Sequence, residues 1–205
     1  MKQSESSTRA SLVAAGRKLF ADNGFDGASV RDLCALAGAN LGAVTYHFRT
    51  KQALYGEVID STVAPMADRL VAAATGPGAP LDRAEAVVRA HFAYLRDHPE
   101  LPRLLVRSLL DTGMPPAAAL THLRRVMAAA RLLIEEGQRD GSIRPGHPIV
   151  MALGLMSQSL HLTMLRASLG QLGAIDLADQ ADSAQVLDNI VRSVRGGLAA
   201  GAEAP

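Results

Sequence analysis

Apolar residues recur at helical spacing along almost the whole chain, and the segments marked in this way end at glycine or proline. Near the start, one such face consists of Leu12, Gly16, Leu19 and Phe20, and Gly24 ends the segment that carries it. Aromatic residues make up only 3% of the chain, whereas strands draw on aromatic and β-branched side chains. An all-α fold is therefore predicted.

Nine helices are expected, over residues 7–23, 30–37, 41–48, 51–74, 81–97, 100–110, 116–138, 148–169 and 182–198. Ser29 and Asp32 form the Ser-x-x-Asp pattern of a capping box at the start of the second helix. Thr50 can cap the fourth helix, and Pro65 is expected to kink or split it. Residues 75–80, with two glycines and two prolines, are predicted to form a loop.

The charge is distributed unevenly along the chain. Residues 1–52 carry seven Lys or Arg against four Asp or Glu, a net charge of +3, whereas residues 53–205 carry fourteen against sixteen, a net charge of −2. We therefore expect two domains, a basic head over residues 1–52 and a larger body over residues 53–205. A polyanionic partner should meet the head.

Enzyme chemistry finds little support in the sequence. Cys34 is the only cysteine, which excludes an internal disulfide and a cysteine-based zinc site. The six histidines have no metal-ligand spacing, and no P-loop or Ser-x-x-Lys motif is present. No catalytic residue, metal or cofactor is therefore expected.

One segment has the length of a membrane span, because residues 148–165 contain no Asp, Glu, Lys or Arg. Ser157, Gln158, His161 and Thr163 make it too polar for that role, so a helix buried on two sides is the preferred interpretation. The first seven residues are polar and lack a secretory signal. We therefore expect a cytoplasmic protein without a membrane partner.

Residues 30–51 carry the spacing of a helix-turn-helix motif. Cys34, Ala35 and Ala37 are small enough for two helices to approach closely, and Gly38 permits the turn. In the helix over residues 41–48, Val44 and Phe48 share one face.

The opposite face of that helix is expected to carry Gly42, Ala43 and Tyr46. Two interpretations stay open at this point. The stripe of small residues either lets the helix enter a DNA groove, or it is merely a solvated surface.

Three segments of the sequence resemble the TetR family of bacterial transcriptional regulators. They are Gly-Phe-Asp-Gly-Ala-Ser-Val-Arg-Asp-Leu at 24–33, Ala-Gly-Ala-Asn-Leu-Gly-Ala-Val-Thr-Tyr-His-Phe at 37–48, and Lys-Gln-Ala-Leu at 51–54. The resemblance implies a nine-helix, two-domain regulator that binds double-stranded DNA through the head. The body would bind a small-molecule effector and dimerise.

The resemblance also assigns a DNA-binding face, which comprises Arg31, Leu41, Gly42, Ala43, Thr45, Tyr46, His47 and Lys51. Arg31 and Lys51 would contact phosphate. Many family members have Tyr where this chain has Thr45, so a phosphate contact made by that ring would be shorter or absent. Leu41, often polar in relatives, could meet a thymine methyl group.

A dimer is expected because the helix over residues 41–48 contains no Arg, Lys, Asn or Gln to read bases, so one copy would discriminate poorly. Two heads would read a near-palindrome with half-sites about one helical turn apart. The dimerisation residues are predicted to be Leu153, Met156, Leu160, Ile190 and Val194. The alternative is that both helices concerned pack only inside their own subunit.

Polar residues on otherwise apolar body helices are candidates for an effector pocket, namely His91, Tyr94, Gln158 and His161. An unidentified small molecule would shift the fourth helix and spread the heads, releasing a repressor from its operator. The alternative function is a helical adaptor that binds only protein.

Overall fold

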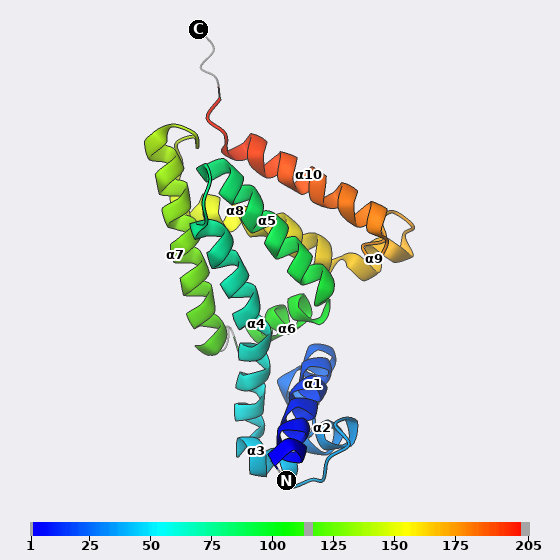
Figure 1. Ribbon diagram of the computed structural model, residues 1–205. Coiled ribbons are helices and arrows are strands. Elements are labelled where there is room, and N and C mark those ends of the chain that lie inside the picture. The colour runs from blue at the N-terminus through cyan, green and yellow to red at the C-terminus, as the bar shows by residue number, and fades with distance from the viewer. Residues whose placement is uncertain (1, 113–116, 202–205) are drawn as a thin grey trace. The chain divides into compact units, whose positions relative to one another are not determined.

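The computed structural model describes residues 2–112 and 117–201 of the 205-residue chain, and these residues form helices and loops without a strand (Figure 1). One antiparallel β-bridge among them joins Ile143 to Ala199. The all-α prediction is confirmed. The helices are α1 (Lys2–Gly27), α2 (Val30–Leu36), α3 (Ala43–Phe48), α4 (Lys51–Thr75), α5 (Pro80–Asp97), α6 (Glu100–Thr112), α7 (Ala117–Asp140), α8 (Pro148–Met164), α9 (Arg166–Gln171) and α10 (Gln180–Leu198).

The described residues thus form ten helices where nine were expected, because the helix predicted over residues 148–169 is broken. Leu165, at φ −83° and ψ 0°, ends α8 and precedes α9. Thr163 Oγ1 donates to the carbonyl oxygens of Ser159 at 2.8 Å and Leu160 at 3.0 Å. Such bonds from a threonine to the preceding turn compete with regular helix geometry and favour a bend.

The junction between α1 and α2 follows the local signals in the sequence. Gly24 has φ 73°, which only glycine adopts readily, and a short further turn leads to Gly27. The backbone N–H of Asp32 donates to Ser29 Oγ at 3.1 Å, and that hydroxyl donates to the Asp32 carboxylate at 2.6 Å. The predicted cap at Ser29 is confirmed.

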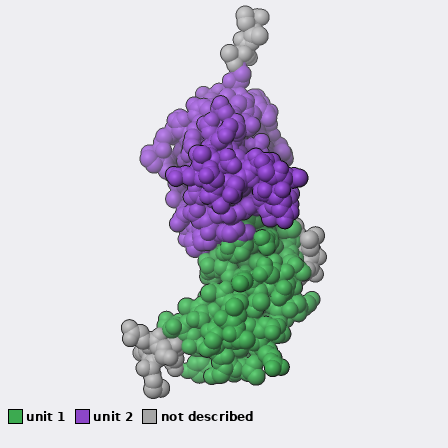
Figure 2. Space-filling model, turned by 90° about the vertical axis from the view of Figure 1, so that its right-hand side faces the viewer, with its two compact units in different colours: residues 1–64, 100–121 green, residues 65–99, 122–205 purple. Residues whose placement is uncertain are grey.

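The chain divides into two compact units (Figure 2). Unit 1 spans residues 1–64 and 100–121, and unit 2 spans residues 65–99 and 122–205. Unit 1 therefore includes α6 and the first part of α4 in addition to α1, α2 and α3. The expected domains over residues 1–52 and 53–205 were drawn from the charge distribution, and that assignment stays a prediction. The change of unit falls at Pro65, but α4 continues through this residue and is not split.

The core of unit 1 contains an aromatic cluster that joins α1 to the first part of α4. The Tyr55 ring lies edge-on to Phe20, with centroids 4.9 Å apart, and to Phe25, at 5.2 Å. Gly16 allows the same two helices to touch, because a Cβ atom there would lie 2.7 Å from Val58 Cγ2. This contact requires the absence of a side chain.

Unit 2 is organised around α5, which packs against both α8 and α10. Phe92 and Leu95 of α5 are fully buried. His91, also buried, lies 2.6 Å from Ser159 Oγ of α8 through its Nδ1 atom. On the outer side, Arg195 of α10 pairs with Asp82 and Glu85 of α5.

The uncharged segment over residues 148–165 contains α8, and one side of this helix is buried within the chain, while burial of the other side in an assembly stays a prediction. Met151 and Leu155 face the core, whereas Val150 and Leu153 are exposed. Within the part of the chain that the structure describes, no helix has the length and apolar character that a membrane span needs.

Replacing Gly16 with alanine is expected to destabilise the protein, since the new Cβ would overlap Val58, which is fully buried and β-branched. The matched control is Gly56→Ala in α4, where a Cβ atom meets nothing within 4 Å. The control should gain up to about 1 kcal/mol of helix propensity. Urea unfolding measures both, and a Gly16→Ala variant as stable as the control would contradict the tight contact.

Candidate nucleic-acid interface

A short turn connects α2 to α3. The Ala39 N–H donates to the Cys34 carbonyl at 2.9 Å, and Gly38 has φ 64°, as its predicted role in the turn requires. Leu33 and Cys34 of α2 are buried. The chain then passes through Gly42, at φ −78° and ψ −12°, before α3 begins. Residue 41 therefore lies in the turn and not in the helix.

One side of α3 is buried and the other is exposed. Val44 and Phe48 retain only 2% and 7% exposure, as predicted. On the outside, the exposed residues are Leu41, Gly42, Thr45 and Tyr46, which we call the outer stripe. Leu41 is 64% exposed and Tyr46 is 69% exposed. The large side chains of this stripe thus lie at the surface of the described chain.

The expectation that Ala43 belongs to the outer face is wrong, because its side chain is only 6% exposed. Both α1 and α2 pack against α3. The buried side of α3 therefore includes Ala43 as well as Val44, and His47 at its edge is half-buried. On a helical wheel Ala43 and Thr45 lie at equal angles on either side of Val44, so periodicity gives both the same exposure. Only the positions of the neighbouring helices decide that Ala43 is buried and Thr45 is exposed.

His47 stands between the core and the outer stripe. Its ring meets Tyr46 edge-on, with centroids 4.9 Å apart and planes at 87°. It also lies 6.3 Å from the Phe48 ring. Since His47 is half-buried, its contact restricts how the exposed Tyr46 ring can turn.

Lys51 is placed differently from the free phosphate anchor that the resemblance implies. Its Nζ atom donates to the carbonyl oxygens of Phe25 at 2.8 Å and Ala28 at 3.2 Å. It also lies 4.4 Å from the centroid of the Phe25 ring. Two of the three N–H donors are therefore used to hold the end of α1, and a phosphate contact by the third stays a prediction.

Arg49 is a surface cation that sequence reasoning did not select. It ends α3 at φ 70°, and it is the one residue other than glycine with positive φ in the described ranges. Thr50 follows and accepts a hydrogen bond from the Ala53 N–H at 3.1 Å, which confirms its predicted capping role. The sequence could have indicated that Arg49 lies at an exposed corner, because only two residues separate the predicted third and fourth helices.

The charge around the outer stripe is positive. Residues 33–56 contain no Asp or Glu, while Arg49 and Lys51 lie within them. Arg31, on α2, is exposed, and so is Arg49. A surface without carboxylates and with cations at its edges is suited to a polyanion.

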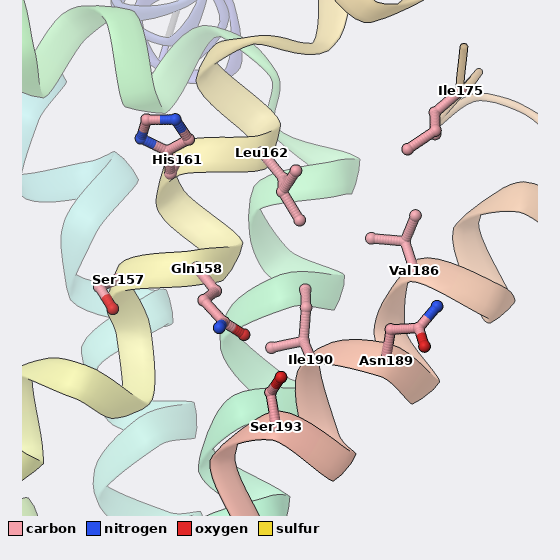
Figure 3. Close-up of a pocket in the computed structure, with 9 residues that line it drawn as sticks. All are labelled: Ser157, Gln158, His161, Leu162, Ile175, Val186, Asn189, Ile190 and Ser193. Atoms are coloured by element: carbon pink, nitrogen blue, oxygen red, sulfur yellow. The ribbon is translucent and has the colours of Figure 1, made fainter. Parts of the chain in front are cut away.

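The four residues predicted to bind an effector do not form one site. His91 is buried against Ser159, and Tyr94 is buried with its ring 4.2 Å from that of His98. Gln158 and His161 are exposed and line a hollow between α8 and α10 (Figure 3). Sequence periodicity alone could not tell a buried polar residue from one on an open surface.

The predicted dimerisation residues also differ in exposure. Leu153 is 49% exposed, whereas Ile190 is only 2% exposed and packs within its own chain, so its assignment to an interface is wrong in this structure. Met156, Leu160 and Val194 are half-buried. The exposed apolar residues of this region are Val150, Leu153, Met164 and Leu165, which we call the α8 ridge.

No group of His, Cys, Asp or Glu within the described ranges could hold a metal ion. The outer stripe and its edges carry exposed apolar, hydroxyl and cationic groups.

Known proteins resemble this chain over the same elements. The family model described as bacterial regulatory proteins, tetR family, matches residues 12–58, which contain α2 and α3. The HTH-type transcriptional repressor NicS of Pseudomonas putida is 27% identical over 185 residues, covering 88% of this chain and 87% of that protein. The HTH-type transcriptional regulator RutR of Escherichia coli K12 is 22% identical over 198 residues, covering 94% and 91%. A crystal structure of a tetR-family regulatory protein from Rhodococcus RHA1 superposes with a TM-score of 0.77 at 18% identity, covering 95% and 98%.

The burial of His91 makes folding sensitive to acid. Burial lowers the pKa of this imidazole from 6.5 to about 4, so between these values the unfolded chain binds a proton that the folded chain does not. The contribution of His91 is therefore complete above pH 6.5 and is lost as the pH falls toward 4. The loss should reach about 2–3 kcal/mol near pH 4.5.

Urea unfolding at pH 7.5 and pH 4.5 measures this effect. His91→Gln should lose about 2–3 kcal/mol less than the wild type on acidification. The exposed His147 gives the control, and His147→Gln should behave as the wild type does. Equal acid sensitivity of His91→Gln and wild type would refute the assignment.

Proposed function

Because this chain belongs to the TetR family of bacterial regulatory proteins and is a DNA-binding transcriptional regulator, we propose that it acts as a dimeric repressor that reads a palindromic operator and is released by a small molecule. Repression is proposed because NicS, one of its relatives, is named a repressor. A cytoplasmic location and the absence of an enzymatic activity are part of the same proposal.

The observation that carries the DNA-binding role of α3 is the exposed outer stripe beside a carboxylate-free, cationic surface. The major groove admits an α-helix, and small residues let the helix backbone come close to the bases. Gly42 and Thr45 provide that close approach. The Tyr46 hydroxyl would contact phosphate or a base edge, and Leu41 would meet a thymine methyl group.

Phosphate contacts would come from the cations at the edge of the stripe. Arg31 and Arg49 are exposed, and Arg49 stands at the corner between α3 and α4. We add Arg49 to the proposed interface on this ground. Lys51 would act chiefly by holding the α1–α2 junction in place, through its bonds to two carbonyl groups.

Dimerisation follows from how little base readout one copy can provide. α3 contains no Arg, Lys, Asn or Gln, and bidentate contacts from such residues give about 1–3 kcal/mol of discrimination each. Two copies double the contacts and read half-sites about one helical turn apart, with DNA shape adding to the selection. A near-palindromic operator is the consequence.

The α8 ridge is the proposed dimer contact. Val150, Leu153 and Met164 recur at helical spacing on the side of α8 that faces away from the core, and Leu165 directly follows the helix. Exposed apolar patches of this kind on a folded protein mark interaction surfaces. In a two-fold dimer the ridge of one copy would pack against that of the other, with α10 beside it, as in a four-helix bundle.

Binding to DNA should weaken in a defined way when the edge cations are removed. Arg31→Gln and Arg49→Gln are each expected to lower the slope of log K against log salt by about one, since each loses one phosphate contact. Tyr46→Ala should weaken binding at least about tenfold, the effect of losing one good contact to a base or phosphate. Fluorescence anisotropy with a fragment from upstream of the protein's own gene measures all three.

Arg124 of α7 is exposed and belongs to unit 2, so Arg124→Gln is the matched control and should leave the salt slope unchanged. If Arg31→Gln and Arg49→Gln bind as the control does, the proposed interface is wrong. If the wild type binds no DNA at all, the protein-only adaptor replaces the repressor.

Sedimentation analysis tests the α8 ridge. Leu153→Glu is expected to raise the dimer dissociation constant roughly 100-fold, because a symmetric interface contains the change twice and each buried charge costs more than about 1 kcal/mol. Leu132 of α7 is 55% exposed and provides the control, Leu132→Glu, which should remain dimeric. A Leu153→Glu dimer as tight as the wild type would place the interface elsewhere.

A further inference from the structure

Asn40 directly precedes the outer stripe, and its side chain is exposed. Its amide group has no hydrogen-bond partner in the part of the chain that the structure describes. An asparagine shortly before a helix ordinarily caps it. Here Gly42 occupies the capping position of α3, and no side chain makes a capping bond to that helix. The fold therefore leaves the Asn40 amide unused.

The backbone of Asn40, in contrast, is held from both sides. Its carbonyl oxygen accepts a hydrogen bond at 3.0 Å from the N–H of Ala43, which is buried in the first turn of α3. The preceding residue, Ala39, donates its N–H to the Cys34 carbonyl of α2 at 2.9 Å. A fixed backbone presents the amide at a defined place, so binding would have to order only the side chain.

The Asn40 side chain lies on the same surface as the outer stripe. A Cβ atom built on Gly42 would lie 3.5 Å from Asn40 Oδ1. The amide is thus beside the one member of the stripe that has no side chain, and the exposed Leu41 follows it directly. Asn40 and the outer stripe therefore form one continuous surface.

Asn40 lies at the end of α3 that is expected to read bases. In a helix-turn-helix protein, residues at the N-terminal end of the second helix contact base edges in the major groove. Residues 37–50 contain two amide or guanidinium side chains that could pair with a base through two hydrogen bonds, Asn40 and Arg49. Arg49 ends α3 and is at the opposite end of the helix. The amide of Asn40 is the one at the reading end.

The chemistry of the amide decides which base it can read. It offers an acceptor oxygen and a donor NH₂ group side by side. In the major groove, adenine presents the complementary pair, with its N6 amino donor beside its N7 acceptor. Guanine presents two acceptors, cytosine a donor, and thymine an acceptor and a methyl group. An asparagine amide without a partner therefore favours adenine.

We propose that Asn40 determines base specificity by making a bidentate contact with one adenine in each half-site. Its Oδ1 atom would accept a hydrogen bond from the adenine N6 amino group, and its Nδ2 atom would donate one to N7. The proposal rests on the proposed function, because it needs α3 to enter the major groove. It adds the identity of one base pair, A·T, to each half of the operator.

Selection of DNA from a random pool tests the base identity with full-length variants. The wild type should recover a half-site with one A·T pair at which Asn40→Ala accepts any base pair, while the other positions stay the same. Asn40→Asp has the same shape but cannot donate to N7, and it should lose the preference for adenine as well. The matched control is Gln52→Ala, which removes an exposed amide from α4 and should recover the wild-type sequence.

A modified base tests the contact itself. 7-Deaza-2′-deoxyadenosine lacks the N7 acceptor but still pairs with thymine. Placed at the selected adenine of one half-site, it should weaken wild-type binding about fivefold, the lower end of the discrimination that a bidentate contact provides. The same change should leave the affinity of Asn40→Ala unaltered, because that variant has no contact to lose. Fluorescence anisotropy measures both.

An unchanged base preference in Asn40→Ala and Asn40→Asp would overturn the role of Asn40 and leave the proposed function standing. So would an equal loss of affinity by the wild type and Asn40→Ala on the modified site. A wild type that recovers no common sequence would refute the proposed function, and the role of Asn40 with it. Circular dichroism spectra should match the wild type, and if Asn40→Ala alters the fold, Asn40→Asp keeps the side-chain shape and decides the outcome.

Discussion

The packing of Val44 and Phe48 against the rest of unit 1 is the contact on which the proposed interface depends. These two side chains determine how α3 is turned about its axis, and with that which residues face outward. Arg9 reinforces the contact, since its guanidinium lies 5.1 Å from the Phe48 ring while it pairs with Glu57 at 2.9 Å. A rotation of α3 that buried Tyr46 would have to expose Phe48, and the loss of that buried surface opposes it.

Packing partners also organise unit 2, where both α8 and α10 pack against α5. The buried pair of His91 and Ser159 connects α5 to α8, and the pairing of Arg195 with Glu85 connects α5 to α10. Between those attachments α8 and α10 share few contacts, and the hollow lies there. The shape of the hollow is thus a consequence of both helices being attached to a third.

Features decided by short-range physics were predictable from the sequence. The positive φ of Gly38, the cap at Ser29 and the exposure of Tyr46 follow from the residue itself and its near neighbours. Features decided by packing partners were not. Ala43 is buried because two helices approach α3 from one side, and Lys51 is occupied because the end of α1 lies beside it. Ile190 and His91 were misassigned for the same reason, since an amphipathic pattern says that a face is buried but not by which chain or helix.

Selection of DNA fragments from a random pool on the purified protein, followed by sequencing, tests the central claim most directly. The account predicts a recovered near-palindrome whose half-sites are centred about one helical turn apart. The Tyr46→Ala variant should fail to recover it while retaining the fold. Recovery of no common sequence by the wild type, or the same palindrome from the variant, would contradict the role assigned to the exposed side of α3.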